Sequence, residues 1–240
     1  MYRSLSFILL ILLIVFAAIQ ITLPSRDSTH QVFNDSKNVE FESGVRRLRD
    51  GTVEVASLVS MPGVTSDMFR WWFSDYLQTT EHYRMWHPED HVWMGWEHKT
   101  LGKITGSHHL VHEYIGGDLM KLRIQFAWPQ EILGYDPTDE NTVAICARVG
   151  ELESSLNIAE MCHVARNTPS GAELRSRFWL GVISDREATG WQNFLLSLLA
   201  NNPISRQFAV SETEGINLHK HCMEEMSYLA DLLPVIYKED

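Results

Sequence analysis

The C-terminal segment from Leu218 to Leu233 predicts one long amphipathic helix whose apolar side contains two ionisable residues. On a period of 3.6 residues the apolar stripe consists of Leu218, Cys222, Leu229 and Leu232. His221 and Glu225 fall inside this stripe. A buried imidazole and a buried carboxylate are costly unless each is paired or binds a metal. The two residues are four apart, so they present a nitrogen and an oxygen ligand from one helical face, a pair that zinc accepts.

A four-coordinate zinc site needs one or two further ligands, and the upstream sequence can supply them. Segment 81–98 contains four histidines among aromatic residues, and a strand-like stretch, Ser107–Gly116, follows it. On a strand, Glu113 shares a face with Val111 and Ile115, which predicts a second buried carboxylate. Each feature alone is more often a solvated or salt-bridged group. Together they predict a metal site.

Composition and the N-terminus restrict the function classes. The net charge of −11 over 240 residues argues against a nucleic-acid partner, which would need a basic face. A basic N-terminus followed by an apolar run predicts that residues 1–23 are a signal peptide or a membrane anchor through residues 5–23, and both alternatives remain open. Either way the protein is expected to be secreted or membrane-anchored, on the extracytoplasmic side. Residues 24–46 are expected to be a polar linker, and residues 47–240 a single domain.

The three cysteines do not define a disulfide framework, because their number is odd and their spacing matches no motif. The sequence is compatible with two alternatives. Two of the residues Cys146, Cys162 and Cys222 form a disulfide, or all three are buried thiols.

The remaining pattern predicts an α+β fold. Alternating or β-branched stretches predict strands at residues 51–59, 110–115, 121–128, 142–149, 156–165 and 173–180. Helices are expected at residues 65–77, leading into a His-rich loop, and around 186–200, and a capping box at Ser211–Glu214 opens the last helix. Antiparallel strands in series followed by one long helix predict a sheet curled around that helix, with a cavity between them.

His163 shares a strand face with Met161 and Ala165, so its ring is expected on the apolar side of the sheet. Two interpretations remain open. The histidine is either a buried neutral residue bonded to the backbone or a general acid or base near the metal.

Several motifs together resemble the 2,4-diacetylphloroglucinol hydrolase family, and the resemblance covers roughly residues 61–233. The motifs are Met61-Pro-Gly-Val, Trp71-Trp72, Tyr83-Arg-Met-Trp-His-Pro-Glu-Asp-His91, His112-Glu-Tyr-Ile-Gly116, His163 with Gly171-Ala-Glu-Leu-Arg-Ser-Arg-Phe-Trp179, and His221-Cys-Met-Glu-Glu225. The resemblance implies a helix-grip (Bet v 1-like) fold, with zinc held by two histidines and two glutamates. It also implies hydrolysis of a carbon–carbon bond between an aromatic polyphenol ring and an acyl group.

The resemblance implies a role for particular residues. His221, Glu225 and Glu113 match metal ligands, and His91 matches the fourth, with His87 as the alternative. Pro88 restricts His87 to extended backbone, which favours His91.

Tyr83 matches a residue that contacts substrate and takes part in catalysis, and His163 matches a histidine beside the substrate. The chain departs from the family pattern at Met94 and Phe178, where polar or phenolic groups are expected to face the substrate.

The implied chemistry is hydrolysis of a phenolic ketone, in which zinc polarises the carbonyl and activates a water. Two alternatives remain: a module of the same fold that binds an apolar ligand without catalysis, and a metal-dependent ester or amide hydrolase.

Overall fold

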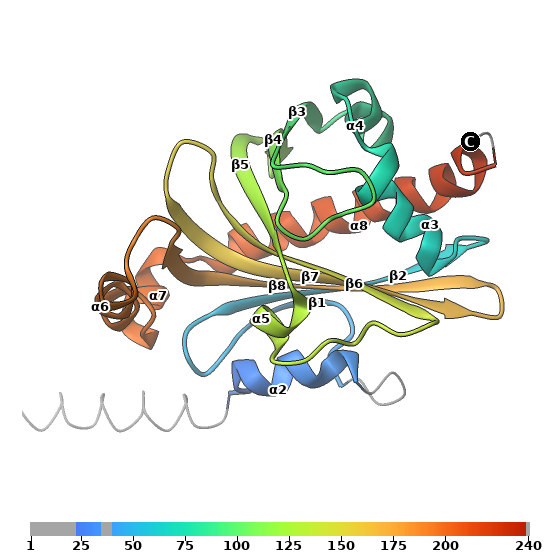
Figure 1. The fold of residues 1–240 in the computed structure, drawn as a ribbon. Coiled ribbons are helices and arrows are strands. Elements are labelled where there is room, and N and C mark those ends of the chain that lie inside the picture. Colours follow the sequence, from blue (N-terminus) through green and yellow to red (C-terminus); the bar gives the residue numbers. More distant parts are fainter. Residues whose placement is uncertain (1–22, 35–39, 239–240) are drawn as a thin grey trace, which may run out of the picture.

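The computed structural model describes residues 23–34 and 40–238, so residues 1–22, where the signal peptide or membrane anchor is predicted, lie outside the described residues. An eight-stranded antiparallel sheet curls around one long helix, α8 (Figure 1). The strands are β1 (Gly44–Arg47), β2 (Val53–Pro62), β3 (His91–Glu97), β4 (His108–Ile115), β5 (Asp118–Ala127), β6 (Thr142–Glu151), β7 (Leu156–Thr168) and β8 (Gly171–Asp185). Their order across the sheet is β1-β2-β8-β7-β6-β5-β4-β3. The predicted helix-grip, Bet v 1-like arrangement is confirmed.

The helices lie on both faces and at one end of the sheet (Figure 1). They are α2 (Arg26–His30), the 3-10 turn η1 (Gln31–Phe33), α3 (Ser66–Trp71) with the π-helical turn η2 (Trp72–Tyr76), α4 (Thr80–Trp86), α5 (Pro129–Leu133), α6 (Gly190–Ala200), α7 (Pro203–Ala209) and α8 (Glu212–Ile236). None of the helices within the described residues has the length and apolar character needed to cross a bilayer.

Helix α8 begins at the predicted capping box. The Ser211 hydroxyl accepts from the Glu214 N–H at 3.1 Å, and the Glu214 carboxylate accepts from the Ser211 N–H at 2.8 Å. Its apolar stripe is fully buried at Cys222, Met226, Leu229 and Leu233. Gly215 lets the helix approach the sheet closely, because a Cβ there would lie 2.8 Å from Val45 Cγ1.

The His-rich segment does not form a loop. Residues 80–86 form α4, whose cap Thr79 accepts from the His82 N–H, and residues 91–97 form the edge strand β3. Pro88 prevents the helix from continuing past His87, whose backbone is extended. The chain therefore reverses over a few residues, and this turn brings His91 back beside Tyr83.

In place of a polar linker, the described residues from 23 to 47 carry α2, η1 and strand β1. Phe33 is 1% exposed in a second hydrophobic core on the outer face of the sheet, together with Trp179 and Leu48. The indole N–H of Trp179 donates to the Thr29 hydroxyl at 2.8 Å. The polar composition concealed this packing because only a few residues of the segment point at the sheet.

Cys146 and Cys162 are direct cross-strand partners on β6 and β7 and form a disulfide in this outer core. Cys222 is a free, buried thiol on α8. One bridge and one free cysteine is thus the arrangement adopted.

Because Phe33 is buried in the outer core, the substitution Phe33→Ala should lower the free energy of unfolding by about 3–5 kcal/mol. The exposed neighbour Gln31→Ala is the matched control and should change it by less than about 0.5 kcal/mol. Urea unfolding followed by tryptophan fluorescence measures both. Equal, small effects would mean that this segment behaves as a linker after all.

Candidate metal centre and cavity

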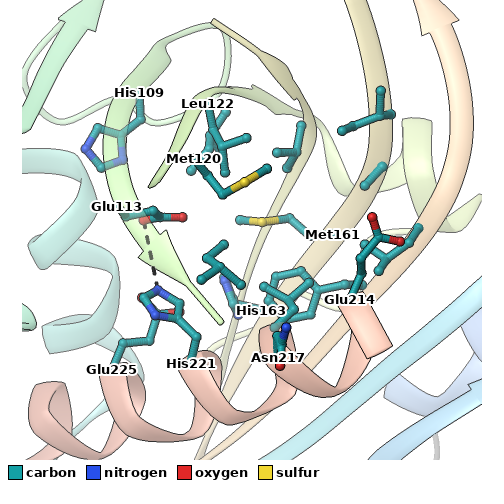
Figure 2. A pocket seen from close by; sticks show the side chains of 18 of the residues that line it. His109, Glu113, Met120, Leu122, Met161, His163, Glu214, Asn217, His221 and Glu225 are labelled. Carbon is teal, nitrogen blue, oxygen red and sulfur yellow. Dashed lines mark ion pairs between the residues drawn. The ribbon is translucent and has the colours of Figure 1, made fainter. Parts of the chain in front are cut away.

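Four side chains from the edge strand β3, its neighbour β4 and helix α8 converge at one end of the cavity. His91 Nε2 lies 3.8 Å from Glu113 Oε2 and 3.6 Å from Glu225 Oε2. His221 Nε2 lies 4.0 Å from an oxygen of each glutamate. Figure 2 shows Glu113 on β4 facing His221 and Glu225 on α8. All four residues are at most 8% exposed.

Local structure positions the two strand residues, His91 and Glu113, and the two helix residues, His221 and Glu225. His91 and Glu113 are direct partners in the β3–β4 ladder, and a bulge follows between His91 and Trp93. A bulge re-aims side chains at a sheet edge, which lets His91 point inward at the start of its strand. His221 and Glu225 are one turn apart on α8 and project from the same face.

The hydrogen bonds of the two histidines leave both Nε2 atoms facing the carboxylates. His91 Nδ1 lies 2.9 Å from the Tyr83 carbonyl, which can only accept, so Nδ1 carries the proton of the neutral ring. His91 Nε2 is then a lone pair, is buried, and has no hydrogen-bond partner. A lone pair that faces two carboxylates is repulsive unless a cation lies between them.

His221 repeats the pattern, because its Nδ1 lies 3.1 Å from Asp90 Oδ2. A histidine ligand whose other nitrogen donates to a carbonyl or a carboxylate is the usual arrangement around zinc. Ligand atoms about 3.4 Å apart would fit a tetrahedral ion with bonds of ~2.1 Å. The separations from His91 Nε2 are 3.8 and 3.6 Å, those from His221 Nε2 are 4.0 Å, and the ligand atoms of His91, Glu113 and His221 all lie within 4.8 Å of one another. These three residues therefore fit a divalent metal ion, and Glu225, 3.6 Å from His91, is the fourth candidate ligand.

Burial shifts the protonation of these groups. Burial lowers the pKa of His91 to about 4, although Glu113 opposes the shift. Burial raises the pKa of Glu225 to about 7, against the opposing effect of His221. For His221, burial lowers the pKa, but the carboxylates of Glu225 and Glu113 outweigh it and the net shift is upward. Without a cation, the cluster reduces its charge by keeping a proton on Glu225.

His87 lies next to this group but faces Asp90. Its Nδ1 accepts the Asp90 backbone N–H at 3.1 Å, and its Nε2 lies 3.6 Å from Asp90 Oδ2. Its ring stacks on His221 with centroids 5.3 Å apart. Of the two candidate histidines, His91 is the one that faces Glu113 and Glu225.

A cavity of about 470 Å³ extends from these residues between the sheet and α8 (Figure 2). This volume is in the range of small-molecule sites. Its walls are mostly apolar and include Phe73, Trp86, Ile115, Met120, Leu122, Ile124, Phe126, Val149, Met161, Phe178 and Leu180.

Tyr83 lies on the wall at the metal end, where its hydroxyl donates to Glu113 Oε2 and its ring stacks on His91 at 3.7 Å. Burial, and then the charge of Glu113, raise the pKa of Tyr83 well above its usual value, so the hydroxyl keeps its proton.

His163 also lines the cavity, on β7. Its Nδ1 lies 2.7 Å from the Ser176 hydroxyl, and Phe178 packs against its ring edge-on. Burial lowers the pKa of His163 to about 4, so the ring is neutral at pH 7. Its hydrogen-bond partner is therefore a side chain and not the backbone group that one interpretation of the sequence expected.

The two positions where the sequence departs from the family pattern differ in location. Phe178 lies on the cavity wall. Met94 is buried in the main core, its backbone pairs with the Thr80 hydroxyl, and its side chain is not among the described residues that line the cavity.

Two further residues belong to the site and were not predicted. Asp90 orients His221, and His109 lines the cavity with a buried Nε2 that has no hydrogen-bond partner. Strand alternation could have revealed His109, because it shares a face with Val111 and Glu113. No sequence pattern could have revealed Asp90, because its contact with His221 spans 131 positions.

Comparison with known proteins gives matches over nearly the whole described chain. Residues 23–238 match the family model described as the DAPG hydrolase PhiG domain. A 2,4-diacetylphloroglucinol hydrolase from a Pseudomonas species is 30% identical over 215 residues, covering 84% of this chain and 72% of that protein. A phloretin hydrolase from Eubacterium ramulus is 27% identical over 201 residues, covering 80% and 69%. Among solved structures, major latex-like protein 151 from Panax ginseng is similar with a TM-score of 0.38 and 14% identity, covering 70% of this chain and 97% of that one.

The geometry predicts that His91→Ala abolishes zinc binding and His87→Ala does not. Loss of His91 removes a ligand nitrogen, so bound zinc should fall from one equivalent to less than about a tenth. His87 supports Asp90 only indirectly, so its loss should weaken binding by no more than about tenfold. Elemental analysis of the purified variants measures their zinc content. Loss of zinc in His87→Ala but not in His91→Ala would identify His87 as the ligand instead.

Zinc affinity should also depend on pH in a defined direction. In the metal-free protein Glu225 keeps its proton up to a pKa of about 7, against a usual value of 4.5, and binding must release that proton. Because the pKa of His221 is also raised, binding must displace its proton too, so the apparent affinity should fall by at least about tenfold per pH unit below pH 7. The contribution of Glu225 to the stability of the metal-free fold should be lost as the pH rises from 4.5 to about 7, while His91 and His163, whose pKa values are lowered to about 4, contribute in the opposite direction. Competition titrations with a zinc indicator between pH 5.5 and 8 test this, and a flat profile would contradict it.

Proposed function

The chain belongs to the 2,4-diacetylphloroglucinol hydrolase family, and we propose that it is a zinc-dependent hydrolase that cleaves the carbon–carbon bond between a phenolic ring and an acyl group. The single observation that carries the proposal is the lone pair of His91 Nε2, buried between two glutamates at the end of an apolar cavity. The names of two relatives, a diacetylphloroglucinol hydrolase and a phloretin hydrolase, support a phenolic ketone as the substrate class.

The residues that would hold the ion are His91, Glu113, His221 and Glu225, each through the atom that faces the others. The chemistry that zinc supplies when bound is Lewis-acid polarisation of a carbonyl and activation of water near neutral pH. Asp90 and the Tyr83 carbonyl hold the two imidazoles in the tautomer that leaves Nε2 free.

The apolar cavity binds and orients the substrate. Aromatic and aliphatic side chains form the walls, so a flat phenolic ring is held by contact and water is excluded from the reacting bond. The carbonyl is the polar end of such a substrate and belongs at the polar end of the cavity, beside Glu113 and His221.

The reaction requires proton movement at the ring. Hydrolysis adds oxygen and a proton to the acyl fragment as an acid, and a second proton to the ring carbon that leaves. Tyr83 holds a proton at its hydroxyl, whereas the neutral ring of His163 has one nitrogen free to accept a proton. His163 can take up the proton that the attacking water loses and then, as the imidazolium, deliver it to the ring carbon that leaves, while the Ser176 hydroxyl holds its Nδ1. We therefore assign proton transfer to His163 and positioning of Glu113 and of the substrate to Tyr83.

Phe178 makes the wall beside His163 less polar than the family pattern implies. The substrate of this protein is accordingly a phenolic ketone whose ring or acyl group meets an apolar surface at this point. We assign this selection to Phe178, because Met94 is not among the described residues that line the cavity.

We also propose that the protein acts outside the cytoplasm, secreted or membrane-anchored. The apolar run within residues 5–23 supports export. The Cys146–Cys162 disulfide is compatible with it, because such bonds persist in oxidising compartments.

With an acylated polyhydroxybenzene, the zinc-loaded protein should release a carboxylic acid and the deacylated phenol without a nicotinamide or nucleotide cofactor. Chromatography of the products after incubation with phloretin or a diacetylphloroglucinol measures this directly. Ready hydrolysis of aryl esters with no cleavage of any acylphenol would replace the proposal with an ester hydrolase, and tight binding without turnover would replace it with a binding module.

Removing the proton-transfer group should slow turnover without removing the metal. His163→Ala should lower kcat by roughly 10²–10⁴-fold, while zinc content stays at one equivalent. Phe69→Leu, a conservative change of a core residue that packs edge-on against the same ring, is the control for disturbed packing and should retain most activity. Unchanged turnover in His163→Ala would make His163 a structural residue.

A further inference from the structure

Helices α6 and α7 expose a group of large apolar side chains, which we call the apolar hairpin. No residue of α6 is buried, although most of its side chains are apolar. The exposed members are Trp191 at 66%, Phe194 at 67%, Leu195 at 45%, Leu198 at 63%, Leu199 at 72%, Ile204 at 63% and Phe208 at 87%. An exposed apolar group of this size on two consecutive helices marks an interaction surface.

The apolar hairpin presents no charge. Residues 190–205 contain no aspartate, glutamate, lysine or arginine. Arg206 turns inward, is 4% exposed, and donates to the Gly181 carbonyl at 2.7 Å and to Asp50. A protein partner that recognises charge would find none here, whereas tryptophan, phenylalanine and leucine are the residues that anchor peripheral helices in the membrane interface.

The base of the apolar hairpin is linked to Pro24, the residue that follows the N-terminal apolar run in the sequence. The Arg49 backbone N–H donates to the Pro24 carbonyl at 2.9 Å. The next residue, Asp50, accepts from Arg206 of α7 at 2.6 Å. Arg49 and Asp50 therefore link the base of α7 to Pro24, the residue that directly follows the apolar run within residues 5–23. In Figure 1, α6 and α7 project beyond the left end of the sheet.

We propose that the apolar hairpin is a membrane-docking surface that inserts shallowly into the interface of a lipid bilayer. Pro24, which follows the N-terminal run, is linked through Arg49 and Asp50 to the base of α7, so a bilayer reached by residues 5–23 would also meet the hairpin. Because the net charge is −11, binding rests on apolar burial and needs no anionic lipid. The proposal is independent of the reaction, although Ala209 and Val210 at the end of α7 line the cavity and so place the cavity beside the bilayer.

Site-specific fluorescence of the full chain reconstituted into phosphatidylcholine vesicles tests the proposal. An environment-sensitive probe is attached at Leu198→Cys in one sample and at Leu101→Cys in another, since the two leucines are 63% and 66% exposed. The unsubstituted chain controls for labelling of Cys222, which is buried. Lipids with a shallow nitroxide quencher should quench the probe at position 198 at least about three times as strongly as the probe at 101, because interfacial helices lie ~5–10 Å deep.

Each other result overturns the proposal. A probe at 198 that is shielded both from lipid quenchers and from aqueous iodide would show that protein covers the hairpin. Dependence of that shielding on protein concentration would identify a second copy, and independence would identify the chain's own N-terminal segment. A probe at 198 that iodide reaches as readily as the probe at 101 would leave the hairpin in water.

A second variant separates docking from folding. Phe194→Ser combined with Phe208→Ser removes two exposed rings and should lower lipid quenching at position 198 by about tenfold. The same pair of changes at Leu101 and Trp128, exposed residues outside the hairpin, should leave it unchanged. Hydrolysis of a water-soluble acylphenol should be equal in both double variants, since neither contains a changed residue of the cavity or the metal site.

Discussion

The constraint on which the site depends is the placement of two carboxylates around two imidazole nitrogens that are all largely buried. His91 Nε2 has no proton to donate to Glu113 and Glu225. Their mutual repulsion is costly in an interior where charge is poorly screened. A divalent ion would remove that cost, and its binding would then be coupled to the stability of this end of the fold.

This coupling explains why the ligands come from both sides of the cavity. His91 and Glu113 lie on the last two strands of the sheet, and His221 and Glu225 lie on α8. Strand β3 has a neighbour on one side only, so the ladder alone holds it weakly. An ion shared between β3, β4 and α8 would fasten the edge of the sheet to the helix and close the cavity at that end.

The described part of the molecule contains two hydrophobic cores that differ in how completely they are filled. The inner core between sheet and α8 leaves the cavity open beside the metal site, whereas the outer core is filled by Phe33, Trp179 and the Cys146–Cys162 bridge. Gly181, with a φ of +89°, bends β8, and its carbonyl accepts from Arg206 of α7. The bend therefore attaches the apolar hairpin to the end of the sheet that borders the cavity.

Periodicity alone determined a large part of this protein. The 3.6-residue period assigned His221 and Glu225 to the buried face of α8, and strand alternation assigned Glu113 to a buried face of β4, because both rules depend only on neighbours along the chain. The same local rules failed for residues 24–46 and for the His-rich segment, where α2, α4 and β3 form against distant partners. The sequence favoured His91 over His87 through Pro88 but did not reveal Asp90. Only the tertiary structure shows that His91 turns toward Glu113, through the bulge and its pairing on the strand ladder, and that Asp90 contacts His221 once α8 packs against the edge of the sheet.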